Sequence, residues 1–123
     1  MVVIDTNVLV DVLRGTPGAI EALTELADVA VVVPTMVRFE VLAGAHRREM
    51  PSIMRLLDEC IDAPVDASVA DAAATFARRY GRSHTGIDPI DYVVAATAQL
   101  LEAQLLTRNV KHFPMFPKLR APY

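Results

Sequence analysis

The chain has 123 residues and a formal net charge of −3, which is long enough for one domain and too short for two. Its apolar fraction of 53% is high, yet no apolar run approaches the roughly 18 residues of a membrane span. The acidic balance argues against tight nonspecific binding of nucleic acid, because such binding needs many Lys and Arg contacts to phosphates.

Two further observations bear on where the protein is located and on which sites its cysteine can form. Asp5 interrupts the first apolar run, so we expect no secretion signal and a cytoplasmic protein that does not enter a membrane. Cys60 is the single cysteine, which excludes an internal disulfide and a thiolate metal site. The surplus apolar surface is suited to a protein partner.

The first segment is a short apolar run that ends in Asp5, Thr6 and Asn7. Such a run is typical of a buried strand, and in open α/β sheets ligands bind beyond the carboxyl ends of the strands. Asp5 is therefore a candidate for chemistry. It is equally suited to be the N-cap of a helix expected over residues 7–13, and this segment alone does not decide between the two roles.

A glycine-rich turn at residues 15–18 separates that helix from a second one, predicted over residues 19–27. A buried strand over residues 29–33 follows and is stopped by Pro34. The chain thus alternates helix and strand from its start.

A third helix, capped by Thr35 and running to Ala43, is apolar except for Glu40. The carboxylate of Glu40 could point to solvent, pair with Arg47 or Arg48, or point inward. The inward orientation requires a cation, because a buried unpaired carboxylate is too costly to keep ionised.

The middle of the chain predicts a helix over residues 49–62, a short strand at 63–65, a helix from 69 to about 80, and a polar loop at 82–87. Basic side chains gather in two places, which solvated helix faces or contacts to phosphates would both explain: Arg47 and Arg48, then Arg78, Arg79, Arg82 and His84.

Asp88, Pro89 and Asp91 open the next helix, over residues 88–98. Asp88 suits the N-cap, Pro89 the first helical position, and Asp91 the third, where a carboxylate favours the helix dipole. That arrangement explains Asp88 structurally. Asp91 precedes a helix apolar enough for full burial, so we expect its side chain at the mouth of that helix, available for chemistry.

A last strand over residues 104–107 ends in Arg108 and Asn109, and the tail at 113–117 is expected to wrap over the domain as ordered coil. Alternating strands and helices predict a single α/β domain over residues 1–123, a three-layer α/β/α sandwich with a mainly parallel sheet.

Four polar side chains occupy comparable places in this scheme: Asp5, Glu40, Asp91 and Asn109. Three converging carboxylates repel one another unless a cation lies between them. All four are oxygen donors, which favours Mg²⁺ or Mn²⁺ over zinc. Since Mg²⁺ commonly binds one or two carboxylates together with a substrate phosphate, the natural substrate is a phosphate ester.

Four stretches of the sequence resemble PIN-domain ribonucleases of the VapC toxin type. They are VVIDTNVLVDVL at 2–13, FEVLAGAHRR at 39–48, IDYVVAATA at 90–98 and LLTRNVKHFPMFPKLRAPY at 105–123. Each motif is weak alone, but the four in this order span the chain and are strongly specific together.

The resemblance implies that Asp5, Glu40 and Asp91 match the acidic residues of the family, with Asp5 and Asp91 as metal ligands. Asn109 falls at the fourth acidic position, where Asp is frequent and Asn also occurs. A neutral amide there can orient a water but weakens the case for a tightly held second ion.

The resemblance also implies supporting residues around the acids. Thr6 and Thr107 match positions where a hydroxyl is usual, and Asp88 competes with Asp91 for the place facing the metal. The side chains available for RNA contacts are Arg47, Arg48, Arg82 and Arg108.

The function implied is hydrolysis of RNA phosphodiesters with Mg²⁺. Similar toxins form homodimers and are silenced by a VapB-like antitoxin, whose carboxyl-terminal segment lies in a groove of the toxin. Two alternatives compete with this interpretation. One is a signalling receiver domain with an acidic Mg²⁺ pocket, which lacks a convincing phosphate acceptor here. The other is a degenerate PIN domain that binds RNA without cutting it, which Asn109 keeps open.

Overall fold

The computed structural model describes all residues, 1–123, and has a four-stranded sheet at its centre. Its strands run in the order β3-β2-β1-β4, and every neighbouring pair is parallel. The strands are β1 (Val2–Ile4), β2 (Val31–Pro34), β3 (Ile61–Ala63) and β4 (Gln104–Leu106). Because parallel strands cannot be joined by hairpins, helices connect them and cover the sheet.

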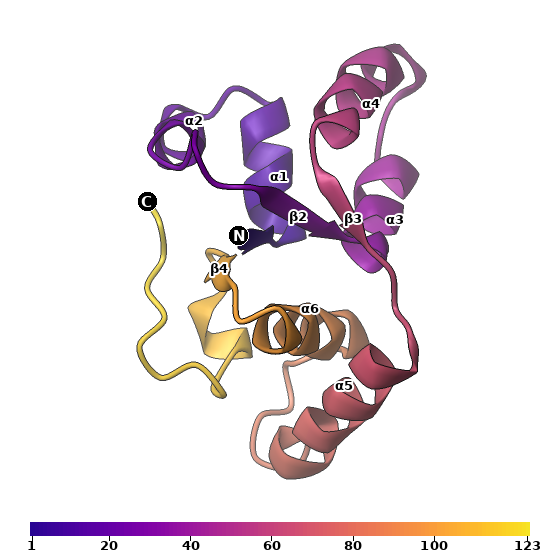
Figure 1. Ribbon diagram of the computed structural model, residues 1–123, viewed down its shortest axis with the longest axis vertical. Coiled ribbons are helices and arrows are strands. Elements are labelled where there is room, and N and C mark those ends of the chain that lie inside the picture. The colour runs from indigo at the N-terminus through magenta and orange to yellow at the C-terminus, as the bar shows by residue number, and fades with distance from the viewer.

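Six α-helices and two short 3₁₀ helices complete the fold. They are α1 (Thr6–Leu13), α2 (Pro17–Thr24), α3 (Thr35–Ala43), η1 (Arg47–Glu49), α4 (Met50–Asp58), α5 (Ala67–Tyr80), α6 (Pro89–Leu100) and η2 (Val110–His112). In Figure 1, α1 and α2 lie on one side of the sheet and α6 lies on the other, with α5 packed outside α6. The predicted three-layer α/β/α sandwich is therefore confirmed, and its sheet is entirely parallel. None of the helices is long and apolar enough to cross a membrane.

The main core lies between the sheet and its helices. Val2, Val3 and Ile4 of β1 are completely buried, as a central parallel strand with helices on both faces requires. Phe113, which follows η2, is 1% exposed and joins the same core. The tail after η2 is thus anchored to the domain, as ordered coil rather than as a strand.

The third strand lies earlier than predicted, at Ile61–Ala63 instead of residues 63–65, and the helix before it ends at Asp58 instead of 62. Pro64 explains the difference, because a proline has no N–H to donate to the ladder and ends the strand. Residues 61–63 pair with β2 and so cannot belong to the helix.

The predicted bounds of the second helix are also wrong. The helix α2 begins at Pro17 and ends at Thr24, whereas the sequence predicted residues 19–27. Pro17 is favourable at a first helical position, where no N–H is needed. Gly15 closes α1 with a φ of +76°, a left-handed conformation that glycine adopts readily at helix ends.

The Cys60 thiol is half-buried, and burial raises its pKa, which is consistent with an inert side chain.

Candidate functional site

Asp5 and Thr107 meet where the central strand β1 and the edge strand β4 end. The two strands are parallel neighbours with Ile4 paired to Leu106, so the residues that follow them are adjacent. The hydroxyl of Thr107 donates to Asp5 Oδ2 at 2.7 Å. Asp5 is 4% exposed and Thr107 is completely buried, so this carboxylate is held at the floor of the site.

Asn7 links the same carboxylate to the loop after β4. Its Nδ2 donates to Asp5 Oδ2 at 3.1 Å and to Thr107 Oγ1 at 3.3 Å. Its Oδ1 accepts from the backbone N–H of Arg108 at 3.1 Å. The side chain of Asn7 therefore bridges α1 and the 107–109 loop.

The two roles that the sequence left open for Asp5 coexist. Asp5 is the N-cap of α1, and its Oδ1 accepts from the backbone N–H of Thr6 at 2.8 Å. Its pKa is nevertheless raised, chiefly by burial, against the opposing hydrogen bonds from Thr107, Thr6 and Asn7. The negative charge of Asp88 raises it further.

Thr6 links Glu40 to the Asp5 carboxylate, because it donates a hydrogen bond to each of them. The hydroxyl of Thr6 donates to Glu40 Oε1 at 2.7 Å, across 34 residues of sequence. Glu40 is half-buried on α3 and forms no ion pair with Arg47 or Arg48. Of the alternatives that the sequence left open for Glu40, the pairing with Arg47 or Arg48 is excluded, and its carboxylate instead accepts a hydrogen bond from Thr6, the residue next to Asp5.

Asp88 and Asp91 form a capping box at the start of α6. Asp88 Oδ1 accepts from the backbone N–H groups of Ile90 and Asp91, and Asp91 Oδ2 accepts from that of Asp88. Asp91 is 8% exposed, so the capping arrangement encloses it more than a position at the helix mouth suggests. Burial, followed by the charges of Asp88 and Asp5, raises the pKa of Asp91 to about 6.

Asp5 and Asp91 are near enough for the charge of Asp5 to raise the pKa of Asp91. Asp5 and Asp91 come from the ends of β1 and the start of α6, 86 positions apart in the sequence, and the charge of Asp5 acts on Asp91. Both groups hold their protons more tightly than free aspartates, since each would otherwise carry a buried charge beside a like charge.

His112 is a neighbour of this cluster that the sequence analysis missed. Its Nδ1 lies 3.1 Å from Asp91 Oδ2. His112 belongs to η2, three residues beyond Asn109, and no local pattern singles it out. Its place within the stretch that resembles PIN domains was the only available signal.

The backbone of Asn109 lies beside Thr107, which holds the Asp5 carboxylate. Its N–H donates to Thr107 Oγ1 at 3.0 Å, while its exposed side chain forms no hydrogen bond within the protein. The role of its amide oxygen in the site stays a prediction.

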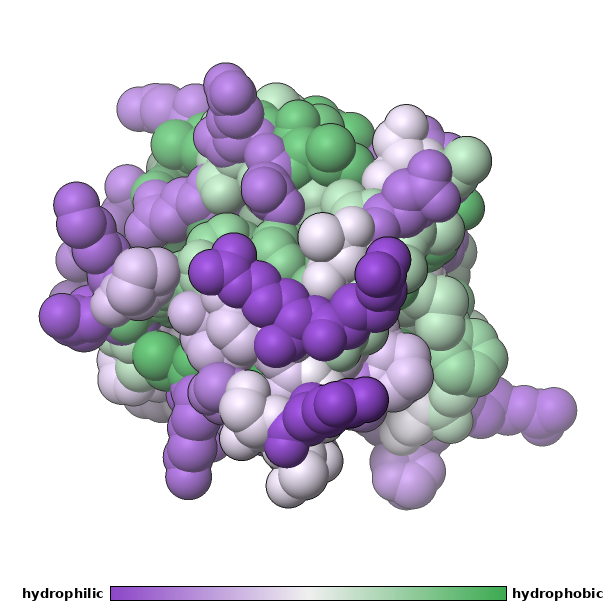
Figure 2. All heavy atoms as spheres, turned by 90° about the horizontal axis from the view of Figure 1, so that it is seen from below, coloured by the Kyte–Doolittle hydropathy of each residue, from purple (hydrophilic) through white to green (hydrophobic).

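The arginines predicted to contact RNA are not part of this hydrogen-bonded group. Arg47, Arg48 and Arg82 are exposed, and none forms an ion pair with a carboxylate of the cluster. The guanidinium of Arg108 is bound to Asp11. Figure 2, which views the molecule from the side of α5, shows hydrophilic side chains projecting at many places with apolar surface between them.

The donor set fits a magnesium ion held by few protein ligands. No three His, Cys, Asp or Glu side chains lie close enough together to hold a metal ion, so the predicted convergence of Asp5, Glu40 and Asp91 around one cation is not observed. Two carboxylates, Asp5 and Asp91, are within electrostatic reach of each other, and Asp91 Oδ1 has no hydrogen-bond partner in the protein. Mg²⁺ typically uses one or two carboxylates and completes its shell with water and substrate phosphate.

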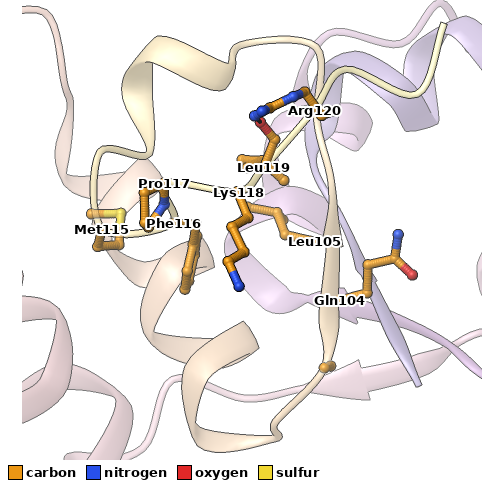
Figure 3. A pocket seen from close by; sticks show the side chains of 9 residues that line it. Gln104, Leu105, Met115, Phe116, Pro117, Lys118, Leu119 and Arg120 are labelled. Carbon is orange, nitrogen blue, oxygen red and sulfur yellow. Dashed lines mark hydrogen bonds between the residues drawn. The ribbon is translucent and has the colours of Figure 1, made fainter.

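A separate cavity of about 500 Å³ lies between β4 and the tail (Figure 3). Leu105, Met115 and Phe116 line it together with Lys118 and Arg120. It includes Ala103 and Gln104, at the amino end of β4, whereas the carboxylates follow the carboxyl ends of the strands. Because it contains no acidic side chain, it cannot supply the ligands predicted for a metal ion.

Comparison with known proteins identifies the family. The PIN domain family matches residues 2–118. Over 125 residues covering both chains completely, the sequence is 43% identical to ribonuclease VapC19 of Mycobacterium tuberculosis. It is 36% identical over 124 residues to ribonuclease VapC10 of the same organism, covering 93% of that protein and all of this chain.

Solved structures agree with this assignment. A toxin–antitoxin complex from Klebsiella pneumoniae contains a chain with a TM-score of 0.83 and 27% identity, and the match covers 100% of this chain and 98% of that one. VapBC2 of Rickettsia felis has the same fold, with a TM-score of 0.81 at 19% identity and coverages of 98% and 97%. The chain therefore belongs to the PIN-domain family, and its relatives within that family are VapC ribonucleases.

Proposed function

We propose that this PIN domain is a metal-dependent endoribonuclease, the toxin of a VapBC-type toxin–antitoxin pair. The observation that carries the proposal is the position of two buried carboxylates, Asp5 after β1 and Asp91 in the first turn of α6, with the charge of Asp5 raising the pKa of Asp91. The capping roles of Asp5 and Asp91 do not offset the repulsion between two buried like charges, whereas a shared cation does. The ribonuclease relatives match along the whole chain, which supports RNA as the substrate class.

Asp5 and Asp91 would hold Mg²⁺, with Mn²⁺ as an alternative. When bound, the ion supplies charge neutralisation at the phosphate and makes a water more acidic. Thr107 and Asn7 fix the Asp5 carboxylate through its Oδ2, and the backbone N–H of Asp88 fixes Asp91. These contacts hold the two carboxylates before substrate arrives, so little reorganisation is needed during the reaction.

Glu40 is the residue that we assign to the attacking water. Thr6 holds its Oε1 at 2.7 Å, which leaves Oε2 without a hydrogen-bond partner in the protein. A carboxylate held in this way can accept a proton from the water as it attacks phosphorus, which is general-base catalysis. Asn109 would orient a water through its side-chain oxygen. The exposed Arg47, Arg48 and Arg82 would bind flanking phosphates.

Removing divalent metal is expected to lower the rate of RNA cleavage by at least about 100-fold, because several kcal/mol of charge stabilisation disappear. The purified chain would be incubated with total bacterial RNA in Mg²⁺, in excess EDTA, and in EDTA followed by excess Mg²⁺. The new RNA ends would then be mapped by sequencing. Restoration of the same ends by added Mg²⁺ supports the proposal.

A parallel preparation of Asp5→Asn controls for contaminating nucleases. Cleavage that persists in EDTA contradicts the metal requirement. Absence of cleavage with either Mg²⁺ or Mn²⁺ contradicts the enzymatic assignment and favours an RNA-binding domain that does not cut.

The partners that we assign are a VapB-like antitoxin and a second copy of the chain. The Klebsiella pneumoniae relative, which is 27% identical, was solved as a toxin–antitoxin complex. An apolar patch on this chain is formed by side chains around the β3 edge and the end of α6, namely Met1, Ile61, Leu100 and Leu101, which are 54%, 50%, 49% and 36% exposed. Such a patch is typical of a protein–protein contact.

Light scattering of the chain at micromolar concentration is expected to give about twice the monomer mass of 13.4 kDa. Leu101→Glu would place a charge in the apolar patch and is expected to shift the mass toward that of the monomer. Glu102→Gln, at the neighbouring exposed position, is the control. A wild-type chain that is monomeric at this concentration contradicts the homodimer.

A further inference from the structure

Three residues far apart in the sequence meet beside α1. The hydroxyl of Tyr123 donates to Asp11 Oδ2 at 2.7 Å, and Nη1 of Arg108 donates to the same oxygen. The guanidinium carbon of Arg108 also lies 5.8 Å from the centre of the Tyr123 ring. Asp11 is 8% exposed, so these partners replace the water that it would otherwise bind. We refer to Asp11, Arg108 and Tyr123 as the clamp.

The clamp is connected to the Asp5 carboxylate by two successive hydrogen bonds. The backbone N–H of Arg108 donates to Asn7 Oδ1 at 3.1 Å, and Asn7 Nδ2 donates to Asp5 Oδ2 at 3.1 Å. Thr107, directly before Arg108, donates to the same Asp5 oxygen. The position of residue 108 therefore determines how two donors meet Asp5.

The protonation states favour this arrangement at neutral pH. The Tyr123 hydroxyl is the main cause that lowers the pKa of Asp11, partly opposed by burial, and Arg108 lowers it further. Burial and the bond to Asp11 raise the pKa of Tyr123 to about 12. The tyrosine is thus a donor and the aspartate an acceptor, and Asp11 remains ionised between its two donors.

We propose that Tyr123, acting through Asp11 and Arg108, is a positioning residue for the Asp5 carboxylate. The proposal rests on the function proposed above, because it assigns to Asp5 the role of metal ligand. Tyr123 itself makes no hydrogen bond to Asp5, Glu40 or Asp91. Its effect is to hold the Arg108 backbone against Asn7, so that Asn7 and Thr107 keep a fixed geometry around Asp5.

Gly18 provides a second way to disturb the clamp. A Cβ added at Gly18 would lie 2.9 Å from Tyr123 Cβ, so an alanine there must displace the tyrosine. Gly18 belongs to α2, where alanine is otherwise favourable to the helix. Gly18→Ala therefore moves Tyr123 while leaving every clamp side chain chemically intact.

The test compares Tyr123→Phe and Gly18→Ala with the wild type. Mn²⁺ affinity, measured from the electron paramagnetic resonance signal of free Mn²⁺, is expected to fall about tenfold, as for other residues that orient metal ligands. The kcat for total bacterial RNA is expected to fall similarly with KM unchanged. Hydrogen exchange at the Arg108 backbone amide is expected to accelerate.

Tyr80→Phe is the matched control, because the Tyr80 hydroxyl makes no hydrogen bond in the structure and its loss should change none of these quantities. In an Asp11→Asn background, Tyr123→Phe is expected to have little further effect, since the two residues act through one bond.

A lower melting temperature with unchanged Mn²⁺ affinity and kcat overturns the proposal, because the clamp then only ties the tail to α1. If the wild type cuts no RNA, the proposed function fails. Mn²⁺ affinity and exchange at Arg108 still test the coupling in that case, and unchanged values of both overturn it.

Discussion

Asp5→Asn is expected to lower RNA cleavage by at least about 100-fold while leaving the chain folded. The substitution removes one of the two carboxylate charges assigned to the metal, and several kcal/mol of transition-state stabilisation depend on that ion. The side chain keeps its size and its place between Thr107 and Asn7. The measurement is the initial rate of cleavage of total bacterial RNA in Mg²⁺.

The Asp5→Asn variant is expected to remain folded, because weaker hydrogen bonding lowers its stability while the removal of a buried charge raises it. In one orientation the NH₂ group of the new amide at position 5 faces the Thr6 N–H, and in the other it faces the Asn7 Nδ2 and the Thr107 hydroxyl, so one or two hydrogen bonds are weakened. The substitution also removes the buried charge of Asp5, whose pKa is already raised, and this offsets the loss of hydrogen bonding. Melting followed by circular dichroism should therefore differ from wild type by only a few degrees.

Asp71→Asn is the matched control for this variant, because Asp71 is an exposed carboxylate on α5, away from the cluster, and its replacement should leave the rate unchanged. Full activity of Asp5→Asn would overturn the assignment of the site. Loss of activity together with unfolding would instead show that Asp5 is needed only as the N-cap of α1.

The sequence predicted the residues whose role follows from local rules. Asp5 follows a buried apolar run, and strand ends of parallel sheets are where sites form, so its position needed no tertiary information. Asp88 and Asp91 obey the N-cap and third-position preferences, which act within one helical turn. Both features appear in the structure as expected from the pattern.

The interactions that the sequence did not predict join residues without a shared local pattern. Glu40 is held by Thr6, which is 34 residues away, and Asp11 meets Tyr123 across 112 residues. His112 carries no signal apart from the segment in which it lies. Such contacts depend on the order of strands in the sheet, which the hydrophobic periodicity of single segments does not encode.

Asp91→Asn is expected to stabilise the metal-free protein above pH 6, and to remove the stabilising effect of Mg²⁺. The pKa of Asp91 is raised from 3.8 to about 6, so the folded chain binds its proton more tightly than the unfolded chain does. In metal-free wild type, stability therefore falls as pH rises through this window. Allowing for solvent screening at the helix end, the loss is about 1–2 kcal/mol.

An amide at position 91 carries no charge at any pH, so it avoids that loss while its oxygen can still accept from the Asp88 N–H. In EDTA, we expect the variant to melt roughly 3–8 °C above wild type at pH 7.5, and the advantage to shrink toward pH 4. Asp66→Asn, at the N-cap of α5, is the control, because asparagine is as good an N-cap as aspartate.

The same melting experiment is then repeated with Mg²⁺ present. Because a cation binds the ionised carboxylates, it should raise the melting temperature of wild type at pH 7.5, and more weakly at pH 5, where protons compete for Asp91. The variant has lost one of the two ligands and should not respond. A wild type that gains no stability from Mg²⁺ at pH 7.5 would mean that the paired carboxylates do not bind the ion. An advantage of Asp91→Asn that grows toward pH 4 would contradict the raised pKa itself.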